Sequence, residues 1–370
     1  MKRTRFFHPR VALAILACVA EASAQSKGID PALLAKAKAG NADAEYRIGL
    51  SYSGLRNEKE ANRWILMAAQ NGNVAAQLVL GDMYENGSVP GVVPKDYAQA
   101  AAWFRKAAEQ GDVDAQDELA SLYNNGQGVP QDYSQAAIWW RKAAEQGEAN
   151  SQYYLGLAYY NGQGVPQDYT QAIVWIRKVA EQGKGNEDSP DWIRRVKEQL
   201  CAKARDTLGQ AYAYGHGVPQ DYTQAAAWYR KAADLGDADA QRELGDLYDY
   251  GGVMKIVNAP GGSKRFVRDD GGGPFPKDYS LAAMWYRKAA EQGDAYSQNN
   301  LGALYDSGQG VPQDYAEAYF WYSLAAARSP AGSAENRDNA AVNLTKTVLL
   351  QTQERARKWF EDHPAQTNPQ

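Results

Sequence analysis

The chain has 370 residues, which is enough for two or three ordinary domains. Its 40 basic and 44 acidic residues leave a net charge of −4, and 44% of the residues are apolar. This composition excludes a collagen, a disordered acidic tail and a bundle of membrane helices. The acidic balance also argues against a nucleic-acid-binding protein, which usually carries a positive face.

Residues 1–24 have the three parts of a secretory signal peptide. Residues 1–10 carry four positive charges, residues 11–20 are apolar, and a small-x-small cleavage site ends at Ala24. The apolar run is too short to span a bilayer. We therefore expect the mature protein to be periplasmic or secreted. Lipidation at Cys18 is the alternative, which the residues before it fit less well.

One motif is written repeatedly along the rest of the chain. The string Gly-x-Gly-Val-Pro-Gln-Asp-Tyr occurs at residues 126–133, 162–169, 215–222 and 308–315. Its aspartate gives the register of six copies: Asp96, Asp132, Asp168, Asp221, Asp278 and Asp314. These positions are 36, 36, 53, 57 and 36 residues apart, and a tryptophan follows each of them by seven. Trp64 indicates a shorter first copy. Such a period predicts a stack of like units.

Each unit is expected to contain two helices. The second begins at the marker aspartate, a favourable N-cap, with Gln or Glu three residues later in five of six copies, as in a capping box. The first helix carries the pattern small-x-x-x-Leu-Gly-x-x-Tyr. A glycine inside a helix costs about 1 kcal/mol relative to alanine, so we expect close contact between helices at this position. The recurring glycines are Gly49, Gly81, Gly156, Gly209, Gly245 and Gly302.

The combined pattern, Ala-x-x-x-Leu-Gly-x-x-Tyr-x-x-Gly-x-Gly-Val-x-x-Asp-x-x-x-Ala-x-x-Trp-x-x-x-Ala-Ala-x-x-Gly, resembles the Sel1-like repeat family, relatives of tetratricopeptide repeats. The resemblance implies an α/α superhelix that serves as a scaffold for protein assemblies. We therefore predict an all-α superhelical solenoid of about seven 36-residue helix pairs over residues 41–328. A capping half-repeat is expected at residues 25–40, and capping helices with a tail at residues 329–370.

Two insertions, near residues 184–204 and 251–276, account for the longer intervals. We expect the first to lengthen a first helix that carries Cys201, the one cysteine left after signal cleavage. We interpret this cysteine as a structural thiol, with a reactive or dimer-forming thiol as the alternative. The second insertion has the pattern of a β-hairpin and is the most basic segment of the chain. It either contacts a partner or is merely solvated. Its basic residues are Lys255, Lys264, Arg265 and Arg268.

The other candidate partner-binding residues are polar or aromatic side chains that depart from the repeat. Tyr153, Tyr154 and Tyr160 cluster in the first helix of the fourth repeat. In the first helix of the seventh repeat, Asn299 and Asn300 occupy the positions that correspond to Tyr153 and Tyr154. By analogy with tetratricopeptide repeats, first helices would line a partner-binding groove. The repeating tryptophans and tyrosines, in contrast, fall on the stripes that must form the core.

The chain lacks recognisable catalytic, cofactor or metal signatures. Its Gly-x-Gly strings join helix to helix, so a nucleotide-binding loop is not expected. His216 has no second histidine or cysteine nearby, which argues against a metal site. An Arg-Lys pair follows five of the repeating tryptophans, and an acidic residue stands four positions beyond each of these arginines. We therefore expect locally paired charges rather than a polyanion-binding stripe.

These observations favour an exported, non-catalytic scaffold that binds a protein partner, without nucleic acid, cofactor or a membrane span. It would regulate or assemble a cell-envelope complex. A cell-wall or polysaccharide-binding module is the alternative. A β-lactamase-like hydrolase is more remote, because the family branch associated with β-lactams has cysteine pairs that this chain lacks.

Overall fold

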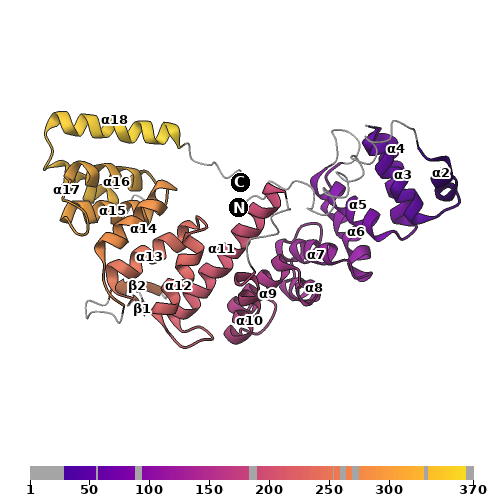
Figure 1. The fold of residues 1–370 in the computed structure, drawn as a ribbon, viewed down its shortest axis with the longest axis horizontal. Helices are drawn as coiled ribbons and strands as arrows, with labels where there is room; N and C mark the ends of the chain where they lie inside the picture. The colour runs from indigo at the N-terminus through magenta and orange to yellow at the C-terminus, as the bar shows by residue number, and fades with distance from the viewer. Residues whose placement is uncertain are drawn as a thin grey trace. The chain divides into compact units, whose positions relative to one another are not determined.

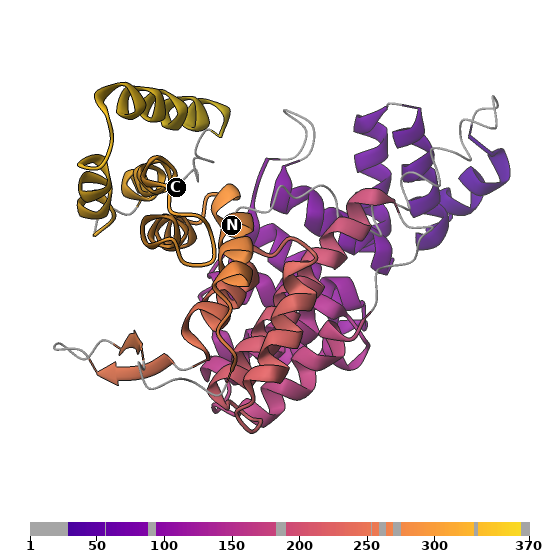
Figure 2. The same cartoon turned by 60° about the vertical axis from the view of Figure 1, so that its left-hand side comes forward.

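The structure is a computed structural model that describes residues 29–55, 57–87, 94–182, 190–252, 275–328 and 332–363, with the backbone of two strands at 254–258 and 264–268. Within these residues it contains seventeen helices and one two-stranded hairpin (Figures 1 and 2). The predicted signal peptide and Cys18 lie outside the described residues. Contacts divide the chain into two compact units, Met1–Trp175 and Ile176–Gln370, which are described separately.

The first unit is a series of antiparallel helix pairs. Within the first three pairs the two helices pack together, and each second helix also packs on the next first helix. A single helix, α2 (Pro31–Lys38), precedes the pairs and covers α3. The pairs are α3 (Ala42–Gly54) with α4 (Glu58–Gln70), α5 (Val74–Asn86) with α6 (Tyr97–Glu109), α7 (Val113–Asn125) with α8 (Tyr133–Glu145), and α9 (Ala149–Asn161) with α10 (Tyr169–Ala180), whose last turn belongs to the second unit.

The second unit repeats this arrangement. Its pairs are α11 (Asp191–Tyr214) with α12 (Tyr222–Ala233), α13 (Ala238–Tyr250) with α14 (Tyr279–Glu291), and α15 (Ala295–Ser307) with α16 (Tyr315–Arg328). Two closing helices, α17 (Ser333–Ala341) and α18 (Lys346–Asp362), both pack on α16. The predicted fold class, an α/α solenoid, is confirmed.

Both insertions form the elements that the sequence predicts. The first extends α11 to 24 residues. The second contains β1 (Met254–Asn258) and β2 (Lys264–Arg268), which pair antiparallel with Met254 opposite Arg268. On α11, Cys201 is buried, and its Sγ lies 3.5 Å from the carbonyl oxygens of Val179 and Gln182. Burial raises the pKa of this thiol, which fits the interpretation of an unreactive structural cysteine.

The marker aspartate joins the two helices of a pair. Asp132 Oδ1 accepts hydrogen bonds from the backbone amides of Ser134 and Gln135, at 2.9 and 3.0 Å, and so caps α8. Its own amide donates to the carbonyl of Tyr123, at the end of α7. The glutamine side chain of a full capping box would need that amide, so only half of the predicted box forms. The same amide-to-tyrosine bond recurs at Asp96, Asp168, Asp221, Asp278 and Asp314.

Four of the recurring first-helix glycines, Gly81, Gly209, Gly245 and Gly302, allow an aromatic ring of the second helix to lie directly on the first-helix backbone, whereas Gly49 faces Ile65. A Cβ at Gly245 would stand 2.4 Å from Tyr286 Cδ1, and one at Gly81 would stand 2.4 Å from Phe104 Cε1. Carbon atoms do not approach so closely, so no larger residue fits without displacing the ring. The close helix contact expected from the sequence is confirmed.

A second glycine, in the interhelix loop, brings neighbouring repeats into backbone contact. Gly164 has a φ of +72°, and a Cβ there would lie 2.0 Å from the carbonyl oxygen of Tyr133, at the start of α8. Gly128 approaches Tyr97 in the same way. The Gly-x-Gly string is therefore a packing device between repeats.

Most of the marker tryptophans are core residues, as expected. Trp285 is 1% exposed and Trp321 is 3% exposed, whereas Trp175 is half-buried. A lysine ammonium covers several of the rings; Lys142 Nζ lies 3.8 Å from the centroid of Trp139.

The predicted Arg–acid pairs form only in part. Arg230 and Arg177 lie 4.0 Å from Asp234 and Glu181. In contrast, a tyrosine hydroxyl in the following first helix accepts a hydrogen bond from each of three other arginines. These pairs are Arg105–Tyr123, Arg141–Tyr159 and Arg287–Tyr305.

Replacing Gly245 by alanine tests the close helix contact. Gly245→Ala should lower the free energy of unfolding by about 1–3 kcal/mol, because the added methyl overlaps the Tyr286 ring. Helix propensity alone would raise the free energy of unfolding by about 1 kcal/mol. The sign of the measured change therefore shows whether overlap with the ring outweighs helix propensity. Urea unfolding followed by circular dichroism measures the change. In a Tyr286→Leu background, which removes the ring, the same substitution should become neutral or stabilising; a stabilising effect in the wild type would contradict the contact.

Candidate partner-binding face

Each first helix carries two adjacent positions whose residues change from repeat to repeat. They stand immediately before the apolar residue that precedes the recurring glycine (Ala120 in α7), and we call them the variable pair. The seven variable pairs are Tyr46-Arg47, Leu78-Val79, Asp117-Glu118, Tyr153-Tyr154, Asp206-Thr207, Arg242-Glu243 and Asn299-Asn300. The surrounding core positions keep their residue types, so the frame is constant while these side chains differ in size and charge.

The three predicted tyrosines of α9 pack against aromatic neighbours of their own unit. Tyr153 is buried and meets Tyr154 edge-on, with 5.6 Å between ring centroids. Tyr154 stacks on Trp140 at 5.3 Å, and the Tyr160 ring lies 5.0 Å from that of Tyr169. Tyr154 and Tyr160 remain half-exposed, so these two keep surface that a partner can reach.

The predicted asparagines of α15 lie beside the closing helices. Asn299 Oδ1 accepts hydrogen bonds from Ser333 Oγ and Asn336 Nδ2, both at 3.1 Å, so α17 engages its side chain. Asn300 is buried, and its Nδ2 has no hydrogen-bond partner within the described part of the chain. The four basic residues of the second insertion lie on the paired strands β1 and β2, and their side chains lie outside the described residues. The predicted tyrosines and asparagines belong to different units, and each group makes its contacts within its own unit.

In the first unit, carboxylates of neighbouring first helices lie close together. Asp117 is 2% exposed and accepts a hydrogen bond of 2.7 Å from Ser151 Oγ on α9. Glu148 caps the start of α9 by accepting from the Ser151 amide at 2.6 Å. Burial, followed by the nearby charge of Asp117, raises the pKa of Glu148 from its ordinary value of 4.5 to about 8.

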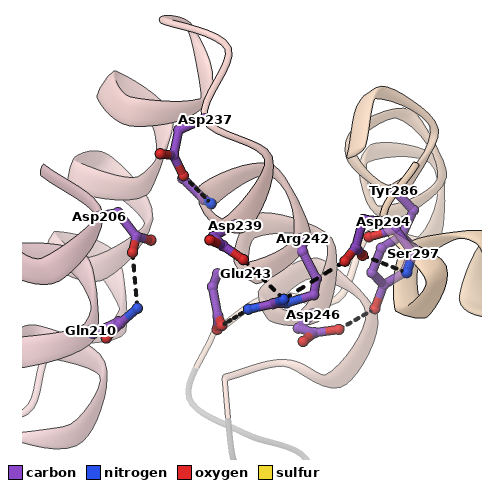
Figure 3. Close-up of polar contacts among 11 residues, drawn as sticks. Asp206, Gln210, Asp237, Asp239, Arg242, Glu243, Asp246, Tyr286, Asp294 and Ser297 are labelled. Carbon is purple, nitrogen blue, oxygen red and sulfur yellow. Dashed lines mark hydrogen bonds and ion pairs between the residues drawn. The ribbon is translucent and has the colours of Figure 1, made fainter. Parts of the chain in front are cut away.

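The second unit holds a larger polar cluster around one arginine (Figure 3). Arg242 on α13 lies 3.1 Å from Asp239 and 3.1 Å from Glu243 on its own helix, and 3.8 Å from Asp294, the N-cap of α15. The arginine therefore links the start of α15 to α13. We call this group, with Asp206, Asp237 and Asp246, the Arg242 cluster; it contains six carboxyl groups and one guanidinium.

Asp206 approaches the cluster from α11. Its Oδ2 accepts a hydrogen bond of 2.9 Å from Gln210 Nε2, and Figure 3 shows its other oxygen directed towards α13. The residue is 9% exposed, and Oδ1 has no hydrogen-bond partner among the described residues. Burial, followed by the charges of Asp237 and Glu243, raises the pKa of Asp206 well above its usual range.

Asp246 lies one helical turn beyond Arg242 and is almost excluded from water. Its Oδ1 accepts a hydrogen bond of 2.5 Å from the hydroxyl of Tyr286, the residue whose ring rests on Gly245. Burial and the charge of Glu243 raise the pKa of Asp246 from 3.8 to about 8, although the tyrosine hydrogen bond opposes the shift. At neutral pH this carboxyl therefore holds its proton.

Sequence reasoning did not single out the Arg242 cluster. Asp206 and Arg242 occupy the same repeat position as Asn299. Comparing this position across all repeats would therefore have identified part of the Arg242 cluster. Asp246 and Asp294 occupy other positions and join the group only through packing.

The described residues contain no group of three or more His, Cys, Asp or Glu side chains suited to hold a metal ion. Among the described helices, none combines the length and the apolar character that a membrane crossing requires.

Stacked helix pairs of one repeating length define an α/α solenoid repeat protein. The Sel1 repeat profile matches residues 42–73, 74–112, 113–148, 149–184, 207–237, 238–259, 268–294 and 295–330. Two of these matches, 238–259 and 268–294, contain the helices of one pair on either side of the hairpin, so the matches correspond to seven pairs. The chain belongs to the Sel1 repeat family, whose members are generally non-catalytic scaffolds for protein–protein interaction.

A solved structure agrees with this assignment, and two curated proteins are similar to part of the chain. The crystal structure of a Sel1 repeat protein from Oxalobacter formigenes superposes with a TM-score of 0.59 at 28% identity, covering 87% of this chain and 85% of the other. An uncharacterised protein of Neisseria meningitidis serogroup B is 30% identical over 113 residues, 28% of this chain and 24% of its own length. The ERAD-associated E3 ubiquitin-protein ligase component HRD3A of Arabidopsis thaliana is 29% identical over 99 residues, 25% of this chain and 14% of its length. The matches to these two curated relatives thus span a quarter or less of each.

The raised carboxyl pKa values predict that the protein becomes less stable as the pH rises from about 4 to about 8. In this window the unfolded chain has released the protons of Glu148 and Asp246, whereas the folded chain retains them. Each carboxyl contributes a slope of at most about 1.4 kcal/mol per pH unit. Urea unfolding at several pH values measures the slope, which Glu148→Gln and Asp246→Asn should each flatten. The exposed control Glu109→Gln should not; an equal effect of all three substitutions would contradict the assignment.

Proposed function

We propose that this protein is an exported, non-catalytic scaffold that holds a protein partner on the first-helix face of its repeats, where the partly exposed members of the variable pairs lie, among them Tyr154, Arg242 and Glu243. The observation that carries this proposal is the contrast between a constant helix frame and a variable pair that changes from repeat to repeat. In chain order the pair is aromatic and basic, apolar, acidic, aromatic, acidic and hydroxyl, basic and acidic, and amide. A packing role alone would favour the same residue at the same position in every repeat. Recognition of a partner whose surface changes along its length favours different residues at that position.

The polar groups of the second unit support a partner segment that carries positive charge. The Arg242 cluster contains six carboxyl groups and one guanidinium, and three of the carboxyl groups contact the guanidinium. Burial raises the pKa values of Asp206 and Asp246, so these two carboxyl groups favour their protonated forms until a positive charge reaches them. A cationic side chain from a partner would complement these groups and allow buried carboxyls such as Asp246 to ionise. Complementary charge also favours rapid and selective association.

Export is proposed from residues 1–24, which have the composition of a cleavable signal peptide. A scaffold in the periplasm or outside the cell would serve a cell-envelope complex. Mass spectrometry of the exported chain should find an N-terminus near Gln25. A mature chain that begins at Cys18 and carries lipid would instead make the protein a lipoprotein.

In-cell cross-linking followed by affinity capture tests the scaffold. The full chain should recover a specific envelope protein, because the first-helix face is built before the partner arrives. Tyr154→Ala in the first unit and Glu243→Gln in the second should reduce recovery, whereas Ile138→Ala, on an exposed second-helix position, should not. A chain without residues 253–274 should retain the partner.

Loss of the partner only on deletion of residues 253–274 would move the contact to the basic hairpin. Equal recovery from every variant would contradict the first-helix face. Recovery of cell-wall fragments in place of a protein would favour the polysaccharide-binding alternative.

A further inference from the structure

A small cavity lies between α11, α12 and α13, next to the Arg242 cluster. Its volume is about 20 Å³, which is room for one group of the size of a water molecule. Four tyrosines and two carboxyl groups from the three helices surround it: Tyr214, Tyr222, Tyr229, Tyr250, Glu243 and Asp246.

The lining residues divide into an inner and an outer set. Tyr229, Tyr250 and Asp246 are buried, whereas Tyr214, Tyr222 and Glu243 are half-exposed. A side chain that enters from outside would therefore pass the half-exposed outer set and contact the buried inner set. The packing that creates the cavity comes from the repeat frame, since Tyr229 rests on Gly209 in the manner of Tyr286 on Gly245.

The chemistry of the lining favours a cation. Tyrosine rings attract cations through their electron-rich faces, most strongly where water is excluded. Glu243, one oxygen of which already accepts a hydrogen bond of 3.1 Å from Arg242, and Asp246 add two carboxyl groups. The hydroxyl of Tyr286 likewise occupies only one oxygen of Asp246. The described chain places no metal-binding group of three or more ligands here. An organic cation on a flexible stem fits these features better than a metal ion.

Size selects among the organic cations. An ammonium group is close to water in volume and donates three hydrogen bonds, whereas a guanidinium is planar and larger. A trimethylated ammonium is larger still. We propose that this cavity binds the ammonium group of a lysine side chain, presented by a protein partner on the first-helix face. The proposal rests on the scaffold function and names the side chain that its second unit recognises.

The second insertion begins at the wall of this cavity. Gly252 lines it, and a Cβ there would lie 2.9 Å from Tyr222 Cγ. Phe275, at the other end of the insertion, is buried beside Gly252, so the described ends of the insertion close one side of the site. The Gly252 amide is consequently a local reporter of occupancy.

Binding is tested with the mature chain and a blocked Gly-Gly-Lys-Gly-Gly peptide as the probe. The titration is followed by the amide resonance of Gly252 at about pH 8.5, above the pKa of Asp246, so that this carboxyl is ionised. The lysine peptide should give a saturable shift. Peptides with arginine or trimethyllysine should bind at least about fivefold more weakly, and norleucine should give no saturable shift.

Three variants separate the cavity from general acidity. Glu243→Gln combined with Asp246→Asn should weaken lysine binding at least about tenfold. Ala213→Leu fills the cavity without changing a charge and should abolish the shift, with the fold checked by circular dichroism. The matched control is Glu109→Gln, which removes an exposed carboxyl group of α6 outside the variable pairs, and it should leave binding unchanged.

Equal affinity for lysine and arginine, or equal weakening by Glu109→Gln, would show nonspecific attraction and overturn the proposal. The absence of a saturable Gly252 shift would mean that the cavity holds water alone. Either result, with envelope-partner capture intact, would refute the lysine site and leave the scaffold standing. Failure of partner capture with a working lysine site would refute the scaffold function and leave the lysine-binding cavity standing.

Discussion

The contact between a second-helix ring and the bare backbone of a first-helix glycine sets the spacing of the helix pairs that use it. At Gly81, Gly209 and Gly245 an added Cβ would stand 2.4 Å from the ring, so the two helices are as close as a ring permits. Because the ring occupies the space of a side chain, the first helix is held in one rotation about its axis. That rotation determines which of its residues face the neighbouring first helices. This packing, rather than the chemistry of their own side chains, therefore determines where the variable pairs lie.

Close packing also explains the electrostatics of the first-helix face. Side chains such as Asp117, Asp206 and Asp246 lie between neighbouring helices and are almost entirely removed from water. Carboxyl groups in such surroundings hold their protons unless a positive charge reaches them. In the second unit Arg242 supplies one such charge, to Asp239, Glu243 and Asp294. The stability of the protein and the charge that it offers a partner are therefore governed by the same buried groups.

Membership of the Sel1 repeat family explains the frame, and the departures from the repeat point to this protein's own specificity. The curated relatives share the chain's repeats over only a quarter of their length or less, so the frame is what they have in common with it. The extended α11, the β1–β2 hairpin and the tyrosine-lined cavity belong to the second unit. Its acidic cluster and its cavity give that unit a chemistry that the repeated motif does not prescribe.

Local signals were sufficient to infer the helix pairs from residues alone, because caps, glycines and aromatic residues recur at fixed offsets and each acts within one or two turns. The same signals located α11 and the hairpin, and the placement of Trp139 and Trp285 in the core. The full capping box failed because the Asp132 amide bonds to Tyr123, a residue of the preceding helix. The Arg242 cluster and the cavity lay beyond such reasoning, since Asp206, Asp246, Tyr286 and Asp294 are spread over four helices. Only the packed chain brings these helices together, and the raised pKa values follow from the water that this packing excludes.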